Sequence, residues 1–250
     1  MNKNNLVSII ITYYKKKKYI KKTLESLYNQ SFQNFEIIFV YDDKDRRDIK
    51  YIKSLIKRFK SVKIIKNKIN YGVAKSRNIA LNYCKGKFIA FLDADDVWLR
   101  NKLKIQTNFM KLYRPDLCYT PYGIIDGDEK LISKRNVSKN VTYNTLMKNC
   151  DIGLSTVMIS NNIKKDIKFA DLKTQEDFAL WLKLLKKGYK FKRCNQVLSN
   201  WRVTENSLSS NNIQKILDAF TLFYKIENKN FIYSVFSVLV LAYNKLKKQH

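Results

Sequence analysis

The sequence predicts an α/β protein with a mainly parallel sheet and helices on both of its faces. Apolar, β-branched runs alternate with longer helical patterns through the first hundred residues, and such alternation implies right-handed crossovers between parallel strands. The runs are almost continuously apolar, as expected of strands covered on both sides. With 250 residues and 45% hydrophobic content, the chain is long enough to bury one large core.

Four strands are expected in the first hundred residues, at positions 6–12, 36–41, 62–66 and 88–92. Two apolar stripes with the 3.6-residue helical period predict the helices between them. The stripes are formed by Ile20, Leu24, Leu27 and Tyr28, and by Ile49, Ile52, Ile56 and Phe59. Because ligands of parallel sheets bind at the carboxyl ends of the strands, the residues that follow each strand are the first candidates for a site.

The remainder of the chain has a less regular pattern. We expect strands at 117–120 and 156–159. A helix should start near Gln175, with an apolar face formed by Phe178, Trp181, Leu182 and Leu185. A further amphipathic helix carries Ile213, Ile216, Leu217, Phe220 and Tyr224.

Residues 231–243 form a run of thirteen residues without a formal charge. At about 1.5 Å per residue, this run is shorter than the roughly 20 residues that span a bilayer. Two interpretations stay open: an interfacial helix with lysines at the lipid headgroups, which we favour, or a last helix packed on the core. The flanking lysines are Lys225, Lys229, Lys245, Lys247 and Lys248.

The histidine and cysteine content excludes several kinds of chemistry. The sole histidine is His250, so Ser-His-Asp catalysis, Cys-His catalysis and His-ligated metals lack their central residue. A general base must therefore be a carboxylate or, less favourably, a lysine, tyrosine or cysteine. The cysteines are widely spaced, as is typical of buried side chains in a reducing compartment. No secretory signal precedes the first strand, so we expect a cytoplasmic protein.

A formal net charge of +28 indicates a strongly positive surface. Such a surface suits phosphates, acidic lipid headgroups or nucleic acid. A genome rich in A and T bases also enriches a chain in lysine without any functional demand. The charge is therefore used only to support conclusions that other features carry.

Three carboxylates, Asp93, Asp95 and Asp96, directly follow the predicted strand at 88–92. Several acids at one strand end repel one another unless a cation or a positively charged ligand neutralises them. Oxygen ligands of this kind select Mg²⁺ or Mn²⁺, which keep coordination positions for water and substrate phosphates. The alternative is a solvated acidic turn in which one aspartate caps the next helix.

Five segments in a fixed order form a more specific pattern. They read LVSIIITYY, FEIIFVYDD, NYGVAKSRN, FLDADDVW and QEDFALW, at 6–14, 35–43, 70–78, 91–98 and 175–181. The series resembles the family 2 glycosyltransferases, which are inverting enzymes with the glycosyltransferase A fold. This resemblance extends over residues 7–209 and implies a Rossmann-like, nucleotide-binding sheet.

The resemblance also implies a domain organisation. Residues 1–210 would form the catalytic domain, with a nucleotide-sugar-binding half at 1–100 and an acceptor-binding half at 101–210. Residues 211–250 would form a C-terminal helical extension in contact with a membrane surface. The protein would then be peripheral on the cytoplasmic face of the inner membrane.

Roles in donor binding follow by position from the resemblance. Thr12 and Tyr14 hold the nucleobase, Asp43 accepts a hydrogen bond from it, and Arg77 contacts the base or the phosphates. Many relatives continue the aspartate pair with Gly-Ser-x-Asp, whereas this chain has Lys-Asp-Arg at 44–46. The expected nucleotide-sugar site is completed by Asp42, Asn70, Gly72, Asp93, Ala94 and Arg202.

Roles in catalysis follow in the same way. Asp95, with Asp93, ligates a Mn²⁺ or Mg²⁺ ion that stabilises the leaving diphosphate. Asp177 is the catalytic base that takes the proton of the acceptor hydroxyl. Attack from the side away from the leaving group inverts the anomeric configuration. The expected supporting residues are Asp96, Glu176 and Trp98.

The resemblance favours a UDP-sugar donor and a lipid-linked saccharide acceptor in the synthesis of O-antigen, capsule or lipooligosaccharide. Thr204 stands where relatives usually have histidine, in a late segment at 200–209 that includes Arg202. Two other functions remain as alternatives. A basic nucleic-acid-binding protein would leave the aspartates without a role and lacks a recognisable motif, so no nucleic acid partner is expected. A metal-dependent nucleotidyltransferase would be expected to have a Gly-rich phosphate loop near its first strand, and none is present.

Overall fold

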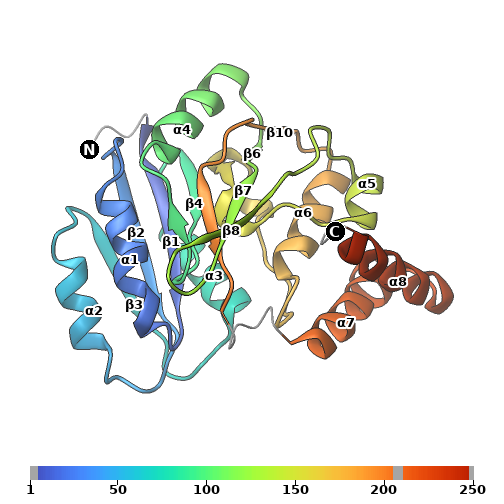
Figure 1. The fold of residues 1–250 in the computed structure, drawn as a ribbon, viewed down its shortest axis with the longest axis horizontal. Coiled ribbons are helices and arrows are strands. Elements are labelled where there is room, and N and C mark those ends of the chain that lie inside the picture. Colours follow the sequence, from blue (N-terminus) through green and yellow to red (C-terminus); the bar gives the residue numbers. More distant parts are fainter. Residues whose placement is uncertain (1–4, 205–210, 248–250) are drawn as a thin grey trace.

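The computed structural model describes residues 5–204 and 211–247, and its centre is a seven-stranded sheet (Figure 1). The strand order is β10-β6-β9-β4-β1-β2-β3. The strands of the first half are β1 (Val7–Tyr13), β2 (Phe35–Tyr41), β3 (Val62–Lys66) and β4 (Phe88–Phe91), and all neighbours among them are parallel. The predicted mainly parallel sheet is therefore confirmed.

Three shorter strands extend this sheet beyond β4. They are β6 (Leu117–Tyr119), β9 (Met158–Ser160) and β10 (Phe191–Arg193). β9 runs antiparallel to both β4 and β6, whereas β10 is parallel to β6. The strand predicted at 156–159 thus begins at Met158, because Leu154–Thr156 form a 3₁₀ turn.

Helices cover both faces of the sheet, as predicted (Figure 1). One face packs against α1 (Lys17–Tyr28), α2 (Ile49–Ile56) and α4 (Lys102–Tyr113). The other packs against α3 (Val73–Leu81), α5 (Tyr143–Lys148) and α6 (Glu176–Lys186). Successive residues of β1 alternate between the two cores, with Ile9 in one and Ile10 in the other, because strand side chains point to opposite faces.

The expectation that all four early strands are covered on both faces is wrong for β3. Its residues are partly or fully exposed, because β3 lies at the edge of the sheet and only β2 pairs with it. β3 carries two exposed lysines, Lys63 and Lys66, and charged side chains of this kind protect a sheet edge from further pairing.

A second, four-stranded sheet was not predicted. Its order is β5 (Val97–Trp98), β11 (Ser199–Arg202), β7 (Tyr122–Ile125) and β8 (Leu131–Arg135). Strands of two to five residues have too little pattern to be recognised in a sequence. This sheet brings β11 alongside the aspartates that follow β4, since β11 pairs with β5.

The C-terminal extension is helical and lies beside α5 and α6 (Figure 1). It consists of α7 (Asn212–Thr221), a π-helical turn (Leu222–Ile226) that includes the predicted Tyr224, and α8 (Phe231–Lys247). No helix within 5–204 or 211–247 is long and apolar enough to cross a membrane. Lys248, His250 and positions 205–209 of the late segment lie outside the described residues.

Gly86 packs closely against the backbone at the start of β1, so a substitution there tests this packing. A Cβ added at Gly86 would lie 2.6 Å from the Ser8 nitrogen and 2.7 Å from the Leu6 carbonyl oxygen. We expect Gly86→Ala to lower the free energy of unfolding by about 1–3 kcal/mol, because backbone atoms must move. Gly127→Ala is the matched control, since its nearest atoms lie 3.9 Å away. Urea denaturation of both variants measures the difference, and equal stabilities would contradict the packing described.

Candidate active site

The carboxyl ends of β1 and β2 carry the first group of predicted site residues. Thr12 is partly buried, and Tyr14 is exposed with the Lys15 ammonium 5.2 Å from its ring centre. Asp43 is buried and accepts a hydrogen bond from the Asp45 backbone nitrogen at 3.0 Å. Tyr14 therefore presents an open aromatic face beside the end of the sheet.

Asp42 organises the turn that follows β3. Its Oδ1 accepts hydrogen bonds from Asn67 Nδ2 at 2.7 Å and from the Tyr71 backbone nitrogen at 2.8 Å. Asn70 Oδ1 accepts from the Gly72 nitrogen at 2.8 Å, and Gly72 has a φ of +83°, which favours glycine. This turn leads directly into α3, so it fixes the position of Arg77 on that helix.

Arg77 joins two acidic groups that are distant in the sequence. Its buried guanidinium donates to Asp93 Oδ1 at 2.6 Å and to Glu176 Oε1, and it lies 5.4 Å from the Phe169 ring centre. Burial raises the pKa of Glu176, and the Arg77 charge opposes this shift. The bridge brings the aspartates after β4 and the acidic start of α6 into one charged cluster.

Asp95 and Asp96 face different partners. Asp95 Oδ2 lies 2.6 Å from the Lys16 ammonium, which also donates to Thr204 Oγ1 at 3.2 Å. Burial raises the pKa of Asp95, while Lys16 acts against this shift. Asp96 is buried, and its Oδ1 accepts from the Arg202 backbone nitrogen at 3.0 Å. Burial, followed by repulsion from Asp95 and Asp93, raises the pKa of Asp96 well above its ordinary value.

The Arg202 side chain makes four hydrogen bonds within the protein, three to backbone carbonyl oxygens and one to a carboxylate. It is buried, and its Nε donates to the Asp95 carbonyl oxygen at 2.8 Å. Its terminal nitrogens donate to the carbonyl oxygens of Asp126 and Gly127, both at 3.1 Å, and to Glu129 Oε1 at 2.9 Å. These bonds use four of its five N–H groups. In this structure Arg202 therefore positions the Asp95 backbone, and its contact with a diphosphate stays a prediction.

Asp177 lies in the first turn of α6, directly after Glu176. Its side chain is partly exposed, and its Oδ1 accepts from the Phe178 backbone nitrogen at 2.7 Å. Desolvation of the carboxyl group by burial, followed by repulsion from Glu176, raises the pKa of Asp177 to about 7. A carboxylate with this pKa is suited to accept a proton near neutral pH.

The two remaining predicted residues, Ala94 and Trp98, take part in hydrogen bonds that support the aspartate loop. The Ala94 carbonyl oxygen accepts a hydrogen bond from Thr23 Oγ1 at 3.0 Å. The buried Trp98 ring donates through Nε1 to the Ser155 carbonyl oxygen at 2.8 Å. Ser155 Oγ in turn accepts from the Asp93 backbone nitrogen at 3.1 Å. These contacts hold the loop rigid without using the side chains that face the site.

Sequence reasoning missed Lys16, Ser155 and Glu129. Lys16 belongs to a run of four lysines at 15–18, in which no local signal distinguishes it from its neighbours. Ser155 and Glu129 lie in short connections whose proximity to the aspartates arises only from the tertiary fold. Thr204 stands where relatives usually have histidine. Because its side chain is hydrogen-bonded to Lys16, this difference was the one feature of the sequence that could have pointed to Lys16.

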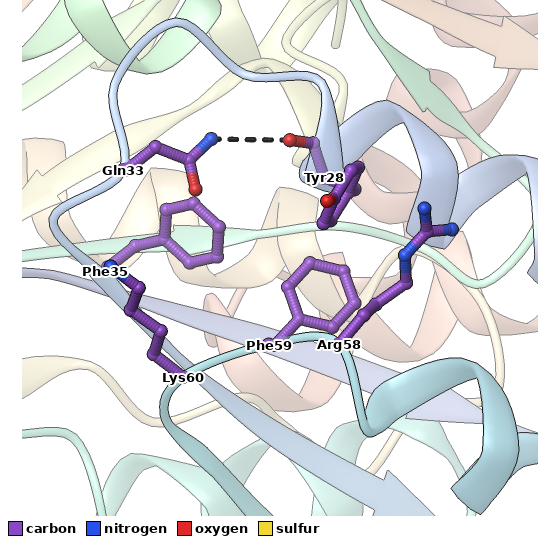
Figure 2. Close-up of a pocket in the computed structure, with 6 residues that line it drawn as sticks. All are labelled: Tyr28, Gln33, Phe35, Arg58, Phe59 and Lys60. Carbon is purple, nitrogen blue, oxygen red and sulfur yellow. Dashed lines mark hydrogen bonds between the residues drawn. The ribbon is translucent and has the colours of Figure 1, made fainter.

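A separate cavity of about 350 Å³ lies at the opposite edge of the sheet, where β2 begins (Figure 2). The Arg58 guanidinium stacks over the Tyr28 ring there, at 3.8 Å from the ring centre. The cavity is lined by Tyr28, Gln33, Phe35, Arg58, Phe59 and Lys60. None of these residues is a carboxylate, so the cavity plays no part in the charged cluster around Arg77.

Comparison with known families decides the assignment of this cluster. The sequence profile of glycosyl transferase family 2 matches residues 8–163, which is more than half of the chain. The chain belongs to glycosyltransferase family 2. The match covers the carboxyl ends of β1, β2 and β4, including Asp43, Arg77 and Asp95.

Individual relatives of this glycosyltransferase agree with the profile. The chain is 34% identical over 213 residues to the Escherichia coli protein WfgD, a UDP-Glc:alpha-D-GlcNAc-diphosphoundecaprenol beta-1,3-glucosyltransferase, covering 84% of this chain and 82% of WfgD. Among solved structures, S. aureus TarS 1-349 in complex with UDP-GlcNAc has a TM-score of 0.71 at 22% identity, over 91% of this chain and 69% of TarS. The mannosyltransferase PcManGT of Pyrobaculum calidifontis, in complex with GDP-Man and Mn2+, has a TM-score of 0.69 at 14% identity, over 92% and 69%.

These comparisons confirm the predicted family and fold class of the glycosyltransferase. Family membership favours sugar transfer over the two alternatives, nucleic-acid binding and nucleotidyl transfer. It also gives the carboxylate cluster a chemical context, since sugar transfer from a phosphorylated donor uses both an acidic centre and a proton acceptor.

Proposed function

We propose that this glycosyltransferase moves one sugar from a UDP-sugar to a hydroxyl of a lipid-linked saccharide, with inversion at the anomeric carbon. The observation that carries the proposal is the Arg77 bridge between Asp93 and Glu176. It joins the acidic loop after β4 to the first turn of α6, which carries Asp177, a carboxyl whose pKa is raised to about 7. A donor centre and a proton acceptor are thus parts of one site.

The donor would lie across the carboxyl ends of β1 and β2. Tyr14 offers an exposed ring for stacking on a nucleobase, and Asp43 offers a carboxylate for a base N–H group. The UDP-Glc in the name of WfgD and the UDP-GlcNAc bound to TarS both support a uridine donor. The expected halves, 1–100 for the donor and 101–210 for the acceptor, meet at Arg77 and Glu176.

The residues after β4 suit a divalent cation. No group of three or more His, Cys, Asp or Glu side chains within 5–204 and 211–247 is arranged to hold a metal. Mg²⁺ and similar ions, however, are held by one or two carboxylates together with substrate phosphates. Asp95 already pairs with a cation, the Lys16 ammonium at 2.6 Å, and this supports a role of its carboxylate in binding positive charge. Asp95 and Asp93 would hold Mn²⁺ or Mg²⁺, which would neutralise charge on the leaving diphosphate.

Asp177 would act on the acceptor. Its carboxylate takes the proton as the acceptor oxygen forms a bond to the anomeric carbon, and the bond from that carbon to the phosphate oxygen breaks. Arg77 holds Glu176 in place beside it. The leaving nucleoside diphosphate departs from the opposite face, so one displacement inverts the configuration.

The acceptor proposal rests on relatives and on charge. WfgD is named for a diphosphoundecaprenol-linked acceptor, and this chain has a net charge of +28, which suits a diphosphate at an anionic membrane surface. Synthesis of a surface polysaccharide such as O-antigen or capsule uses acceptors of this class. We place the protein peripherally on the cytoplasmic face of the inner membrane.

A thermal-shift panel tests the donor and the metal together. We expect UDP-sugars, with Mn²⁺ present, to raise the melting temperature more than GDP- or dTDP-sugars, because specific binding stabilises the native state. Asp95→Asn should remove most of the Mn²⁺-dependent part of the shift, and Asp128→Asn, on an exposed turn, is its control. A shift that is equal for all nucleotides, or unaffected by Asp95→Asn, would contradict the proposed donor site.

A further inference from the structure

Helix α8 has the reverse of the usual burial pattern. Ser234 and Ser237 face the protein interior, with exposed fractions of 0% and 6%, whereas Ile232 is 81% exposed and Phe236 and Leu239 are each 62% exposed. Val238 and Leu241 pack against the core and are only partly buried. A soluble protein normally buries its largest apolar side chains. The exposed apolar surface of α8 therefore indicates a binding surface for a partner or a membrane.

Most of the exposed apolar residues form one stripe. Ile232, Phe236, Leu239 and Tyr243 follow one another at intervals of three or four positions, and Val235 lies beside Phe236, so all five lie on the same side of the helix. We call these five residues the outer face of α8. Helix α7 adds a similar exposed stripe at Ile213, Ile216 and Leu217.

The charge around this face identifies the partner. Residues 211–250 contain six lysines and only two acidic residues, Asp218 and Glu227. Both acids are buried, and Glu227 pairs with the Tyr143 hydroxyl at 2.5 Å and with Lys186 at 3.3 Å. The outward charge of the extension is therefore positive. A second copy of the chain would bring like charges together, whereas anionic lipid headgroups would neutralise them.

Helix length and end charges agree with a position in the membrane interface. The 17 residues of α8 extend about 25 Å, which is less than the roughly 30 Å of a hydrocarbon core. Lys225 precedes α8 and Lys247 ends it, and both are exposed. Lysines at both ends of an apolar face are typical of a helix that lies parallel to a bilayer surface.

Helix α7 links this extension to the candidate base. Asp218 Oδ2 accepts hydrogen bonds from the Thr174 nitrogen at 2.7 Å and from Thr174 Oγ1 at 2.8 Å. Gln175 Nε2 donates to the Lys215 carbonyl oxygen at 2.9 Å. Residues 174 and 175 directly precede the Glu176–Asp177 pair, so α7 is joined to the start of α6 (Figure 1).

We infer that the outer face of α8 docks into the interface of an anionic lipid bilayer and that α7 thereby holds the Asp177 end of the site next to the membrane surface. The inference of docking depends only on the burial and charge of residues in the C-terminal extension. The orientation of the site rests on the proposed function, because only a lipid-linked acceptor gives it a purpose.

Vesicle flotation of the full chain tests the docking. We expect the protein to float with vesicles of phosphatidylcholine and phosphatidylglycerol, and to bind pure phosphatidylcholine vesicles much less. The variant Phe236→Ser/Leu239→Ser should reduce partitioning into the anionic vesicles by at least about tenfold, since two large apolar side chains are lost. The control Leu112→Ser/Ile132→Ser removes two apolar residues of similar exposure, 73% and 59%, elsewhere on the surface and should partition like the unchanged protein.

Other outcomes would overturn the inference. Failure of the unchanged protein to bind anionic vesicles, or equal loss in the control variant, would exclude docking through this face. A dimer in light scattering that Phe236→Ser/Leu239→Ser converts to a monomer, without vesicle binding, would assign the face to a second copy instead. Transfer to a water-soluble acceptor is measured separately and should persist in Phe236→Ser/Leu239→Ser, so a failed catalytic proposal is distinguishable from a failed docking proposal.

Discussion

Asp177→Asn is expected to lower kcat/KM for sugar transfer by roughly 10²–10⁴-fold, the usual contribution of a general base. Asparagine has nearly the same size and shape as aspartate, but its amide oxygen cannot accept the acceptor proton at neutral pH. Since Asp177 is partly exposed and bonds only the adjacent Phe178 nitrogen through its carboxylate among the described contacts, the substitution should leave the fold intact. Initial rates with a UDP-sugar and a saccharide acceptor measure the loss.

The matched control is Asp171→Asn, which changes an exposed aspartate in the segment before α6. It should retain the activity of the unchanged enzyme. Activity of Asp177→Asn within a few fold of that control would show that another group takes the proton. Retained UDP binding in Asp177→Asn, measured by the donor-induced thermal shift, would separate loss of the base from loss of the donor site.

The raised pKa of Asp177 predicts two opposite dependences on pH. As a base, Asp177 must be ionised, so kcat/KM should fall as the pH drops below about 7. Because its carboxyl group is partly buried, Asp177 holds its proton more tightly in the folded protein than in the unfolded chain. Its contribution to stability is therefore fully present below its unfolded pKa and is lost as the pH rises towards about 7. Asp177→Asn should melt at a higher temperature than the unchanged protein at pH 8, and the two should converge at pH 4.

Arg77→Met is expected to lower the free energy of unfolding by about 3–5 kcal/mol, because it leaves the Glu176 carboxylate buried without its partner. Methionine fills a similar volume over the Phe169 ring, so the loss reports charge more than packing. The same substitution should also reduce transfer, since it removes the contact between the loop after β4 and the start of α6. Urea denaturation at pH 7.5 gives the first value.

A double-mutant cycle with Glu176→Gln separates the bridge from other effects. Arg77→Met/Glu176→Gln should be more stable than Arg77→Met alone, because the glutamine carries no buried charge. Arg100→Met serves as a control for loss of an arginine, since Arg100 is exposed on the surface. If Arg77→Met and Arg100→Met were equally stable, Arg77 would contribute nothing beyond a surface charge.

Together, the site and the extension suggest how a protein without a spanning helix in its described part could act on a membrane-linked substrate. The two residues before α6, Thr174 and Gln175, are hydrogen-bonded to Asp218 and Lys215 of α7.

The sequence by itself determined the fold class and most of the residues that could carry chemistry. Continuous apolar runs specify buried parallel strands because their faces are covered on both sides, and this was sufficient for β1, β2 and β4. The acids that follow these runs must lie at the carboxyl edge of the sheet, which placed Asp43, Asp93 and Asp95 along the same edge. The exposed edge strand β3 was misjudged because apolar content alone does not reveal a strand's position in the sheet.

Only the tertiary structure decided which charged groups meet and which helix faces remain open. Arg77 and Glu176 are 99 residues apart, and Arg202 and Asp95 are 107 apart, so no local pattern relates them. Their pairing depends on how α3, α6 and β11 pack against the sheet. In α8 the sequence shows apolar residues on most of the helix surface, and periodicity cannot say which of them are covered. Packing buries Ser234 and Ser237 and leaves Ile232 and Phe236 outside, because long-range contacts, not helical period, select the face that meets the core.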